Sequence, residues 1–310
     1  MCELGSVKNG CSDSKLLQSL CLIIALFLLV SYSSIAAASE PDYPTPDMPQ
    51  QKWWSDGWWD DGHIEAAQNY DVAVSEASYS SEGKDVPVFV YRPADEKKYP
   101  AVLFQHGRRG LDELVQGHAK RLAARGFVVF APDIYSANFM DPYPLEHDPA
   151  LEADVGAGVD ALLARSDISS SRACLYSHTR GGYYTLKVAV TQGRQHTQLA
   201  CYVSYYPHWQ DPNAPEPLQV YGYAPEIDEL RLPTMVFIGE KEQYQRRRPI
   251  DTGVLFLLSK KRDVSLFVYP GVGRGFDFRP KAVRTLADHL ASKDALVRAS
   301  RFMRKHLGNE

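Results

Sequence analysis

The stretch Leu175-Tyr176-Ser177-His178-Thr179-Arg180-Gly181-Gly182 decides the fold. The apolar run from Ala173 to Tyr176 predicts a buried strand, and a helical pattern from Gly182 to Gln192 follows almost at once. Such a sharp strand-to-helix turn needs small residues around its central residue, because the strand and the helix approach each other closely there. Ser177 on one side of Thr179 and two glycines on the other meet this need. The stretch therefore predicts a strand–turn–helix unit of an α/β protein.

The rest of the chain also alternates between strand and helix patterns. Two β-rich runs, 70–79 and 85–92, flank Ser80-Ser81-Glu82-Gly83 and predict a hairpin. Further strands are predicted at 101–104, 127–131, 199–206, 234–238 and 264–269, and further helices at 112–125, 149–165, 249–260 and 280–307. Continuous apolar strands that alternate with helices indicate a parallel sheet covered on both faces. We therefore predict an α/β fold with a mostly parallel, doubly wound sheet and an antiparallel N-terminal hairpin.

Composition excludes several classes of protein. The chain has 310 residues, of which 45% are hydrophobic and 23% charged, with a formal net charge of −4. These values exclude a disordered protein and give no overall attraction to nucleic acid. Five cysteines are too few for a disulfide scaffold of this length. We expect a small-molecule ligand, no nucleic-acid partner, no cofactor and no metal, and the oligomeric state stays open.

The N-terminus has the pattern of an export signal. Residues 16–38 carry no charge, and the dense apolar part, 20–30, is too short to cross a bilayer as a helix. Ala36-Ala37-Ala38 is a typical cleavage signal. We predict a signal peptide over 1–38, an arm rich in Pro and Trp over 39–69, and one domain over 70–310. The protein would then be periplasmic or secreted, without a stable membrane span. An uncleaved membrane anchor is the alternative.

Two features of the mature chain stay open. Cys174 and Cys201 lie in apolar strand-like runs, and the sequence does not show whether they pair. Four of the five tryptophans, at 53, 54, 58 and 59, form a tryptophan box. This box is either an exposed surface that contacts sugars or a membrane interface, or an extension whose indoles pack on the domain. The packed arrangement is favoured, because four exposed indoles would lower solubility.

Several motifs give the chain a family resemblance. The strand–turn–helix stretch above matches a nucleophile elbow. The other matching segments are 105–112 (QHGRRGLD), 131–135 (APDIY), 269–276 (YPGVGRGF) and, more weakly, 238–242 (IGEKE). With these in order, residues 70–307 resemble the dienelactone hydrolase family of the α/β hydrolases. The resemblance implies hydrolysis of carboxylic esters or lactones by a nucleophile, an acid and a histidine, each just after a strand.

The three catalytic positions of that family fall here on Thr179, Glu242 and Arg274, where the family has Ser or Cys, Asp, and His. A guanidinium stays protonated far above neutral pH, so it cannot serve as the base. Thr179 needs a competent base. Such a turn usually holds its central residue at a positive φ, so with this β-branched residue either the turn is relaxed or the strain is tolerated. Glu242 and Arg274 are predicted to form an ion pair that joins two loops but relays no proton.

Other residues at the same sheet edge complete the candidate site. His106 and His208 are the two candidate bases, and Gly107 and Arg108 lie in the loop where the family builds part of its oxyanion hole. Arg108, Arg109, Arg180 and Arg274, with the arginines at 246–248 near the rim, suggest a pocket for an anion. The alternative is that carboxylates at positions 112, 133, 242 or 277 bind these arginines and turn them outward.

Three functions follow from these observations. The first is a protein of the hydrolase fold that lacks a working triad and binds a small anionic or carbonyl ligand, with weak or absent hydrolysis. The second is an active ester or lactone hydrolase that uses Thr179 or a water, with His106 or His208 as base. The third is a cell-envelope interaction protein that contacts its partner through the tryptophan box. The first is favoured.

Overall fold

The computed structural model of the chain describes residues 55–65 and 67–308. These residues belong to one compact unit, which begins at Lys52. The predicted signal segment, its cleavage site and half of the tryptophan box (Trp53 and Trp54) lie outside the described residues. Within the described ranges, no helix is long and apolar enough to cross a membrane.

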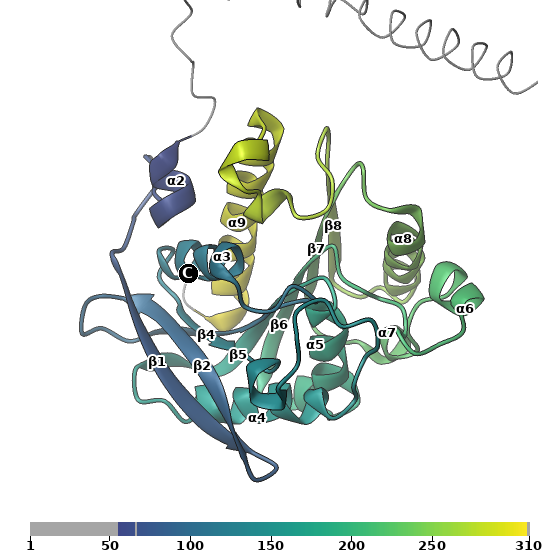
Figure 1. The fold of residues 1–310 in the computed structure, drawn as a ribbon, viewed down its shortest axis with the longest axis horizontal. Helices are drawn as coiled ribbons and strands as arrows, with labels where there is room; N and C mark the ends of the chain where they lie inside the picture. Colours follow the sequence, from purple (N-terminus) through teal and green to yellow (C-terminus); the bar gives the residue numbers. More distant parts are fainter. Residues whose placement is uncertain (1–54, 66, 309–310) are drawn as a thin grey trace, which may run out of the picture. The chain divides into compact units, whose positions relative to one another are not determined.

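The described residues form one eight-stranded mixed sheet (Figure 1), in the order β1-β2-β4-β3-β5-β6-β7-β8. Its strands are β1 (Val72–Ser81), β2 (Lys84–Pro93), β3 (Tyr99–Gln105), β4 (Val128–Pro132), β5 (Ile168–His178), β6 (Leu199–Tyr205), β7 (Thr234–Gly239) and β8 (Val264–Tyr269). β1 and β2 pair antiparallel, β2 pairs antiparallel with β4, and every other pair is parallel. The predicted mixed sheet with an N-terminal hairpin is confirmed.

The hairpin is tighter than its sequence suggests. Ser81 pairs with Lys84, so only Glu82 and Gly83 form the turn, and both have positive φ angles, 48° and 81°. Two residues with positive φ give a turn whose twist matches that of the flanking strands. The turn therefore has two residues, not the four predicted, because Ser80 and Ser81 belong to β1 and pair with β2.

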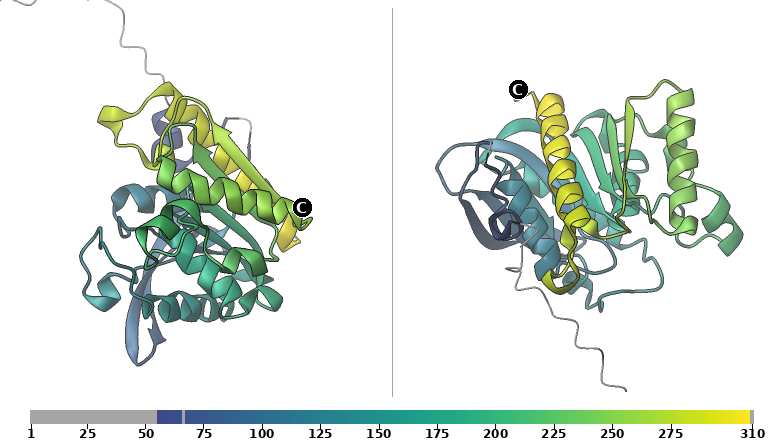
Figure 2. Two further views of the ribbon diagram at one scale, coloured as in Figure 1. Left: turned by 90° about the vertical axis from the view of Figure 1, so that its right-hand side faces the viewer. Right: turned by 90° about the horizontal axis from the view of Figure 1, so that it is seen from above.

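Helices cover both faces of the sheet (Figures 1 and 2). α3 (Glu113–Ala123) and α9 (Leu286–Leu307) pack on one face, and α4 (Leu151–Leu163), α5 (Gly181–Val190) and α8 (Tyr244–Ser259) pack on the other. The strands β3, β4, β6 and β7 are buried between these layers, as is the second half of β5, residues 173–178. The carboxyl ends of the parallel strands therefore meet at one edge, where ligands of such sheets bind. Short helices α6 (Glu216–Tyr221) and α7 (Glu226–Glu229), not predicted, lie between β6 and β7.

Two predicted helices begin elsewhere. α8 was expected to begin at Pro249 but begins at Tyr244, because the Gln and Arg residues before the proline favour helix. α9 was expected to begin near Pro280 but begins at Leu286, where Thr285 and Asp288 form a capping box. A single 3₁₀ turn, Lys281–Val283, lies between these two positions.

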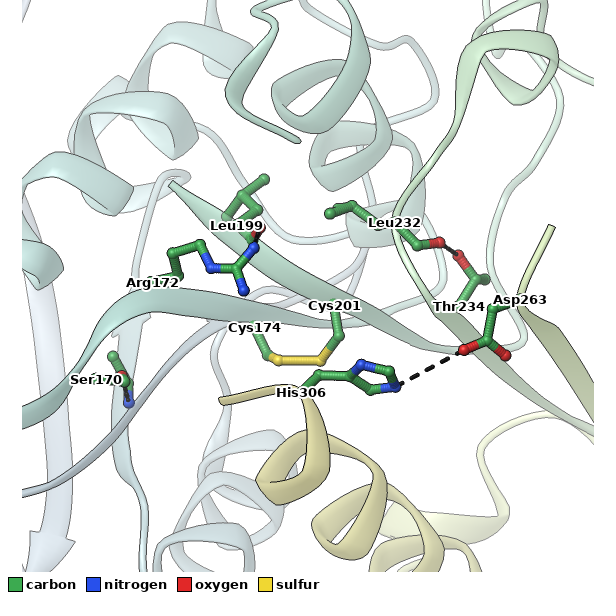
Figure 3. The surroundings of a disulfide bond; sticks show 10 residues. Ser170, Arg172, Cys174, Leu199, Cys201, Leu232, Thr234, Asp263 and His306 are labelled. Atoms are coloured by element: carbon green, nitrogen blue, oxygen red, sulfur yellow. Dashed lines mark hydrogen bonds and ion pairs between the residues drawn. A yellow bond between two sulfur atoms is a disulfide. The ribbon is translucent and has the colours of Figure 1, made fainter. Parts of the chain in front are cut away.

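A disulfide joins the centre of the sheet (Figure 3). Cys174 of β5 and Cys201 of β6 lie directly opposite each other in the parallel pair, with Cα atoms 4.7 Å apart, and both are fully buried. The question that the sequence leaves open is thus answered by a bonded pair. Structural disulfides persist in oxidising compartments and are rare in a reducing cytosol.

The second half of the tryptophan box packs into the core. Trp58 and Trp59 lie on α2 (Asp56–Asp61) and are only 1% and 4% exposed. The Trp58 indole N–H donates to Ser292 Oγ of α9 at 3.0 Å, and Arg121 of α3 lies over both indole rings. For these two side chains the packed arrangement is the one observed.

Candidate active site

The turn after β5 presents Thr179 at the carboxyl edge of the sheet. Its φ is +51°, so this β-branched residue is held in the left-handed region that is usual for such a turn. Backbone bonds fix it there. The Thr179 N–H donates to the carbonyl of Tyr205 at 3.1 Å, and the Thr179 carbonyl accepts from the N–H groups of Gly182 and His208. These backbone hydrogen bonds, to the end of β6 and to the start of α5, hold the turn in this conformation despite the strain.

The loop after β3 fits against this turn only because Gly107 has no side chain. A Cβ atom there would lie 1.6 Å from Thr179 Oγ1. The next residue, Arg108, directs its backbone N–H at the same hydroxyl, over 3.3 Å. Gly181 plays the matching role across the turn, since a Cβ there would meet the carbonyl oxygens of Gln105 and His106 at 2.5 Å.

Glu242 and Arg274 meet across two loops. Glu242 follows β7 and Arg274 follows β8, and Arg274 Nη1 lies 2.9 Å from Glu242 Oε1. The Glu242 side chain is fully buried, whereas that of Arg274 is 21% exposed. Arg274 also donates from Nη2 to the carbonyl of Tyr206 at 2.8 Å and lies over the Tyr206 ring. The predicted ion pair is present, and its geometry holds Arg274 against the protein.

A cavity of about 360 Å³ opens beside Thr179. Its described lining consists of Arg108, Arg109, Tyr143, Thr179, His208, Gln243, Arg246, Arg274, Gly275, Phe278, Arg279 and Pro280. Five of these residues are arginines and none is Asp or Glu. A volume of this size suits a small-molecule ligand.

Three of the five arginines that line the cavity have a carboxylate partner. Arg274 has Glu242, Arg109 has Asp112, and Arg279 has Asp288. Some arginines are therefore bound by carboxylates, as in the second alternative, but they border the cavity and do not point outward. The anion pocket itself stays a prediction.

Arg108 and Arg246 border the cavity without a carboxylate. Arg108 donates to the carbonyl oxygens of Tyr143 and Pro144, which are neutral. The Arg246 side chain has no hydrogen-bond or ion-pair partner among the described residues. Burial lowers the pKa of Arg246 to about 10, with further lowering from Arg274. Glu242 acts on Arg246 without forming an ion pair, so positive charge that has no directly paired carboxylate is concentrated in the cavity.

Of the two candidate bases, only His208 lines the cavity. Burial holds the pKa of His208 well below its usual range, and the positive charges of neighbouring arginines, Arg274 foremost, lower it further. His208 is therefore neutral at pH 7, with a buried Nδ1 that has no partner. His106 lies behind the loop, fully buried, with its Nδ1 2.9 Å from the carbonyl of Gly107.

Arg180 does not line the cavity. Its two terminal nitrogens donate to the carbonyl oxygens of residues 144–146, over 2.5 to 3.1 Å. Its guanidinium therefore fixes the long loop before α4. This side chain, predicted as a ligand contact, positions the loop that carries Tyr143 instead.

A second polar cluster lies beneath the elbow. Asp277 Oδ2 is 2.8 Å from both His178 Nε2 and His118 Nδ1, and Tyr206 Oη donates to Asp277 Oδ1. Among the described residues, His118, His178 and Asp277 form the one group that could gather three metal-ligand atoms. All three are buried, and protein donors already occupy both carboxylate oxygens. The arrangement is that of a hydrogen-bonded core cluster.

Some lining residues were missed by the sequence analysis. Gln243 directly follows Glu242, and Phe278 and Arg279 follow Arg274 within five residues, so loop position could have indicated them. Tyr143 comes from the long connection between β4 and α4, where no motif marks it. Asp277 was one of the carboxylates that could have bound an arginine in the alternative arrangement, but its carboxylate binds two histidines and a tyrosine.

Solved structures with the same architecture place this fold among the α/β hydrolases. A protein from Klebsiella pneumoniae assigned to the dienelactone hydrolases is 22% identical, with a TM-score of 0.58 over 77% of this chain and 100% of its own. Brefeldin A esterase, a bacterial homologue of human hormone-sensitive lipase, is 18% identical, with a TM-score of 0.61 over 81% and 82%. An esterase of Pyrobaculum calidifontis is 17% identical, with a TM-score of 0.57 over 75% and 85%.

A sequence comparison identifies the family within this fold. The sequence profile of the dienelactone hydrolase family matches residues 86–307, which is more than half of the chain. The chain therefore belongs to the dienelactone hydrolase family. No curated protein sequence matches it.

Proposed function

We propose that this protein binds a small anionic or carbonyl ligand at the cavity beside Thr179 and hydrolyses esters or lactones weakly or not at all. Thr179, Glu242 and Arg274 occupy the positions of a nucleophile, an acid and a histidine in the family. Arg274 cannot accept a proton at neutral pH, and its contact with Glu242 uses the acid that would otherwise orient a base. The site thus keeps the shape of a hydrolase without the family's proton relay.

One observation indicates that the ligand is an anion. Arg246 borders the cavity with no partner among the described residues, next to Arg108, whose guanidinium meets only carbonyl oxygens. A guanidinium withdrawn from water is costly unless an anion compensates it. A carboxylate or similar anion in the cavity would supply that compensation through paired N–H donors.

The test is ligand binding to matched variants. Calorimetry with malonate and benzoate should detect binding to the mature chain, and Arg246→Gln should weaken it about tenfold, as expected for loss of one partly buried charge contact. Arg248→Gln is the control, since Arg248 lies on the same helix but stacks on Tyr221 away from the cavity. Equal binding by both variants, or none by the unmodified chain, would contradict the proposal.

A second candidate function rests on His208. Its imidazole is neutral, lines the same cavity as Thr179, and is bonded through its backbone N–H to the Thr179 carbonyl at 2.8 Å. An active hydrolase would use it as base for Thr179 or for a water. Turnover of p-nitrophenyl acetate that disappears in both Thr179→Ala and His208→Gln would favour this function. Turnover that neither variant changes would reject it.

An interaction surface at the tryptophan box is the third candidate. Trp58 and Trp59 are buried, so they offer no contact area to a partner. Deletion of residues 39–62 should therefore lower the melting temperature, because it removes two packed indoles. An unchanged melting temperature would favour the interaction surface.

We also propose that the chain is exported by a signal peptide cut after Ala38. The buried disulfide between Cys174 and Cys201 supports an oxidising compartment. Mass spectrometry of the protein from its native source should find a chain that begins at Ser39. A full-length chain in the membrane fraction would favour the uncleaved anchor.

A further inference from the structure

A second cavity, of about 510 Å³, lies at the edge of the sheet opposite Thr179. Tyr99 and Pro100 at the start of β3, Gly126 before β4 and Ser169 near the start of β5 border it. The amino ends of parallel strands share one edge, so this cavity is separate from the one at their carboxyl ends. Its other walls come from the segment before β1 and from the last turns of α9, through Ile64, Ala67, Gln68, Tyr70, Val297, Ser300, Arg301 and Arg304.

The charges that line this cavity are all positive. They belong to Lys98, Arg125, Arg301 and Arg304, and none of the described lining residues is Asp or Glu. Lys98 and Arg301 are exposed and have no hydrogen-bond or ion-pair partner in the described part of the chain. The nearby carboxylate of Asp95 accepts a hydrogen bond from Tyr99 but does not line the cavity.

Arg125 lies at the centre of this charge. It is only 3% exposed, and its Nη2 donates to two neutral acceptors, the Gly62 carbonyl at 2.8 Å and Asn69 Oδ1. Its Nε is buried and has no partner. Arg304 donates to the backbone carbonyl oxygen of Arg125, which brings its positive charge close to that residue.

The positive charge of Arg304 acts on the Arg125 guanidinium. Burial lowers the pKa of Arg125 to about 10, and the positive charge of Arg304 lowers it further. Burial also lowers the pKa of Arg304. Like charges that are withdrawn from water side by side destabilise one another unless an anion lies between them.

The walls suit an organic group as well as an anion. Tyr70 and Tyr99 meet edge to face with ring centroids 5.3 Å apart, and Ile64 and Val297 add apolar surface. The volume of about 510 Å³ is many times that of a single water-sized group, so a ring fits beside an oxyanion. Four cations favour a doubly charged oxyanion over a single carboxylate, and guanidinium forks match phosphate oxygens.

We infer that this cavity is a binding site for a phosphate monoester that carries an apolar or aromatic group. The phosphate lies between Arg125 and Arg304, with Arg301 and Lys98 at the mouth, and the organic group packs along Tyr70 and Tyr99. The site is independent of the function proposed for the Thr179 cavity, because no residue is shared between the two linings.

The experiment titrates the mature chain with phenyl phosphate by calorimetry, with benzoate and inorganic phosphate as comparison probes. At pH 7.5 phenyl phosphate is a dianion, since its second pKa lies near 6. We expect phenyl phosphate to bind at least about tenfold more tightly than either comparison probe, and less tightly as salt is raised. Binding of benzoate with equal affinity, or no binding of phenyl phosphate at about 10 mM, would overturn the inference.

Variants locate the binding. Arg304→Gln and the double variant Lys98→Gln/Arg301→Gln should each weaken phenyl phosphate at least about threefold. The double variant changes only exposed, unpartnered side chains, so its melting temperature without ligand stays unchanged and loss of folding cannot imitate loss of binding. Lys260→Gln/Lys261→Gln, at the end of α8, is the matched control for net charge and should bind normally.

Arg246→Gln separates the two cavities. Phenyl phosphate binding that survives in Arg246→Gln and falls in Arg304→Gln supports this site, whatever the outcome for malonate at the Thr179 cavity. Binding that falls in Arg246→Gln and is unaffected in Arg304→Gln assigns the ligand to the Thr179 cavity and overturns the inference.

Discussion

Arg274 Nη1 lies 2.9 Å from Glu242 Oε1, and this contact joins the loops after β8 and β7 at the mouth of the cavity. Glu242 is withdrawn from water, and its Oε2 has no hydrogen-bond partner. The carboxylate therefore depends on Arg274 and on the backbone N–H of Gln243, which donates to Oε1 at 2.9 Å. In the function proposed above, these loops carry the acid and histidine positions of a triad, and here they bring an acid to a fixed cation.

Removal of Arg274 alone should destabilise the fold. Arg274→Gln leaves the buried Glu242 carboxylate unpaired, and the cost should be about 2 kcal/mol, below the value for a fully buried pair because Arg274 is partly exposed. Glu242→Gln/Arg274→Gln should recover most of that loss. Urea denaturation of both single variants and the double variant measures the coupling. Additive losses would show that the two side chains do not interact.

The backbone at Thr179 offers a test of strain. At a position with an ordinary negative φ, a protein with Gly is less stable than one with Ala by about 0.5–1 kcal/mol. The reason is that the chain with Gly loses more conformational freedom when it folds. At φ +51° the Cβ of Ala is strained, so Thr179→Gly should be at least as stable as Thr179→Ala. Thermal denaturation of the two variants gives the comparison. A Gly variant that is clearly less stable than the Ala variant would mean that the turn carries no strain.

The family and the sheet could be predicted from the sequence because they depend on local patterns. Apolar runs fix the strands, and the elbow needs small residues around Thr179 wherever it occurs. The Glu242–Arg274 pair was predictable for the same reason, since strand order alone brings those two loops together.

Side-chain direction could not be predicted in this way. Arg180 and Arg246 look alike in the sequence, yet Arg180 turns to the carbonyl oxygens of residues 144–146 and Arg246 turns to the cavity. The choice depends on the path of a long loop that no pattern specifies. The cysteine pair likewise required the register of β5 against β6, which places Cys174 opposite Cys201.

Stability should fall as the pH drops from about 6.5 toward 4. Burial lowers the pKa of His118 to about 4, although Asp277 opposes that shift, so the unfolded chain takes up a proton at a higher pH than the folded chain does. The stabilisation is fully present above the ordinary value of 6.5 and is lost as protonation of the unfolded state proceeds. His118→Gln should therefore flatten the pH dependence of the urea midpoint in this window.

Other groups act in the same direction, so the comparison of variants is essential. Burial also lowers the pKa values of His106 and His208. These two groups contribute to the change of the urea midpoint with pH both in the unmodified chain and in His118→Gln. Burial alone would raise the pKa of Asp277, but His178 and His118 outweigh it and hold that pKa well below its usual range. The contribution of Asp277 to the free energy of unfolding is lost only below about pH 4. Identical slopes in both proteins would contradict the assignment to His118.

Reduction of the disulfide should lower the free energy of unfolding. Cys174 and Cys201 are 27 residues apart, and closing a loop of that length in the unfolded chain corresponds to about 3–4 kcal/mol. Both sulfurs are buried, so a reductant should act only when urea opens the fold. Urea curves with and without dithiothreitol measure the difference, and Cys174→Ala/Cys201→Ala serves as the control. Coincident curves would mean that no bond forms.

Restoring a base should create hydrolysis if the site has kept its geometry. In Thr179→Ser/Arg274→His, the new imidazole stands where Glu242 can orient it, and the serine hydroxyl remains beside the backbone N–H of Arg108. General base catalysis contributes about 10²–10⁴ in rate when well placed. A gain of at least about tenfold in hydrolysis of p-nitrophenyl acetate is therefore expected over the unmodified chain.

Two further variants assign that gain. Thr179→Ser/Arg274→Gln lacks the base but removes the same cation, so it should stay at the starting rate, as should Thr179→Ala/Arg274→His, which lacks the nucleophile. A gain confined to Thr179→Ser/Arg274→His means that the loops after β5, β7 and β8 still hold the spacing of a hydrolase and that the residue at 274 limits the chemistry. No gain means that the cavity has changed shape as well as charge, and that ligand binding at Arg108 and Arg246 is the activity for which the fold is suited.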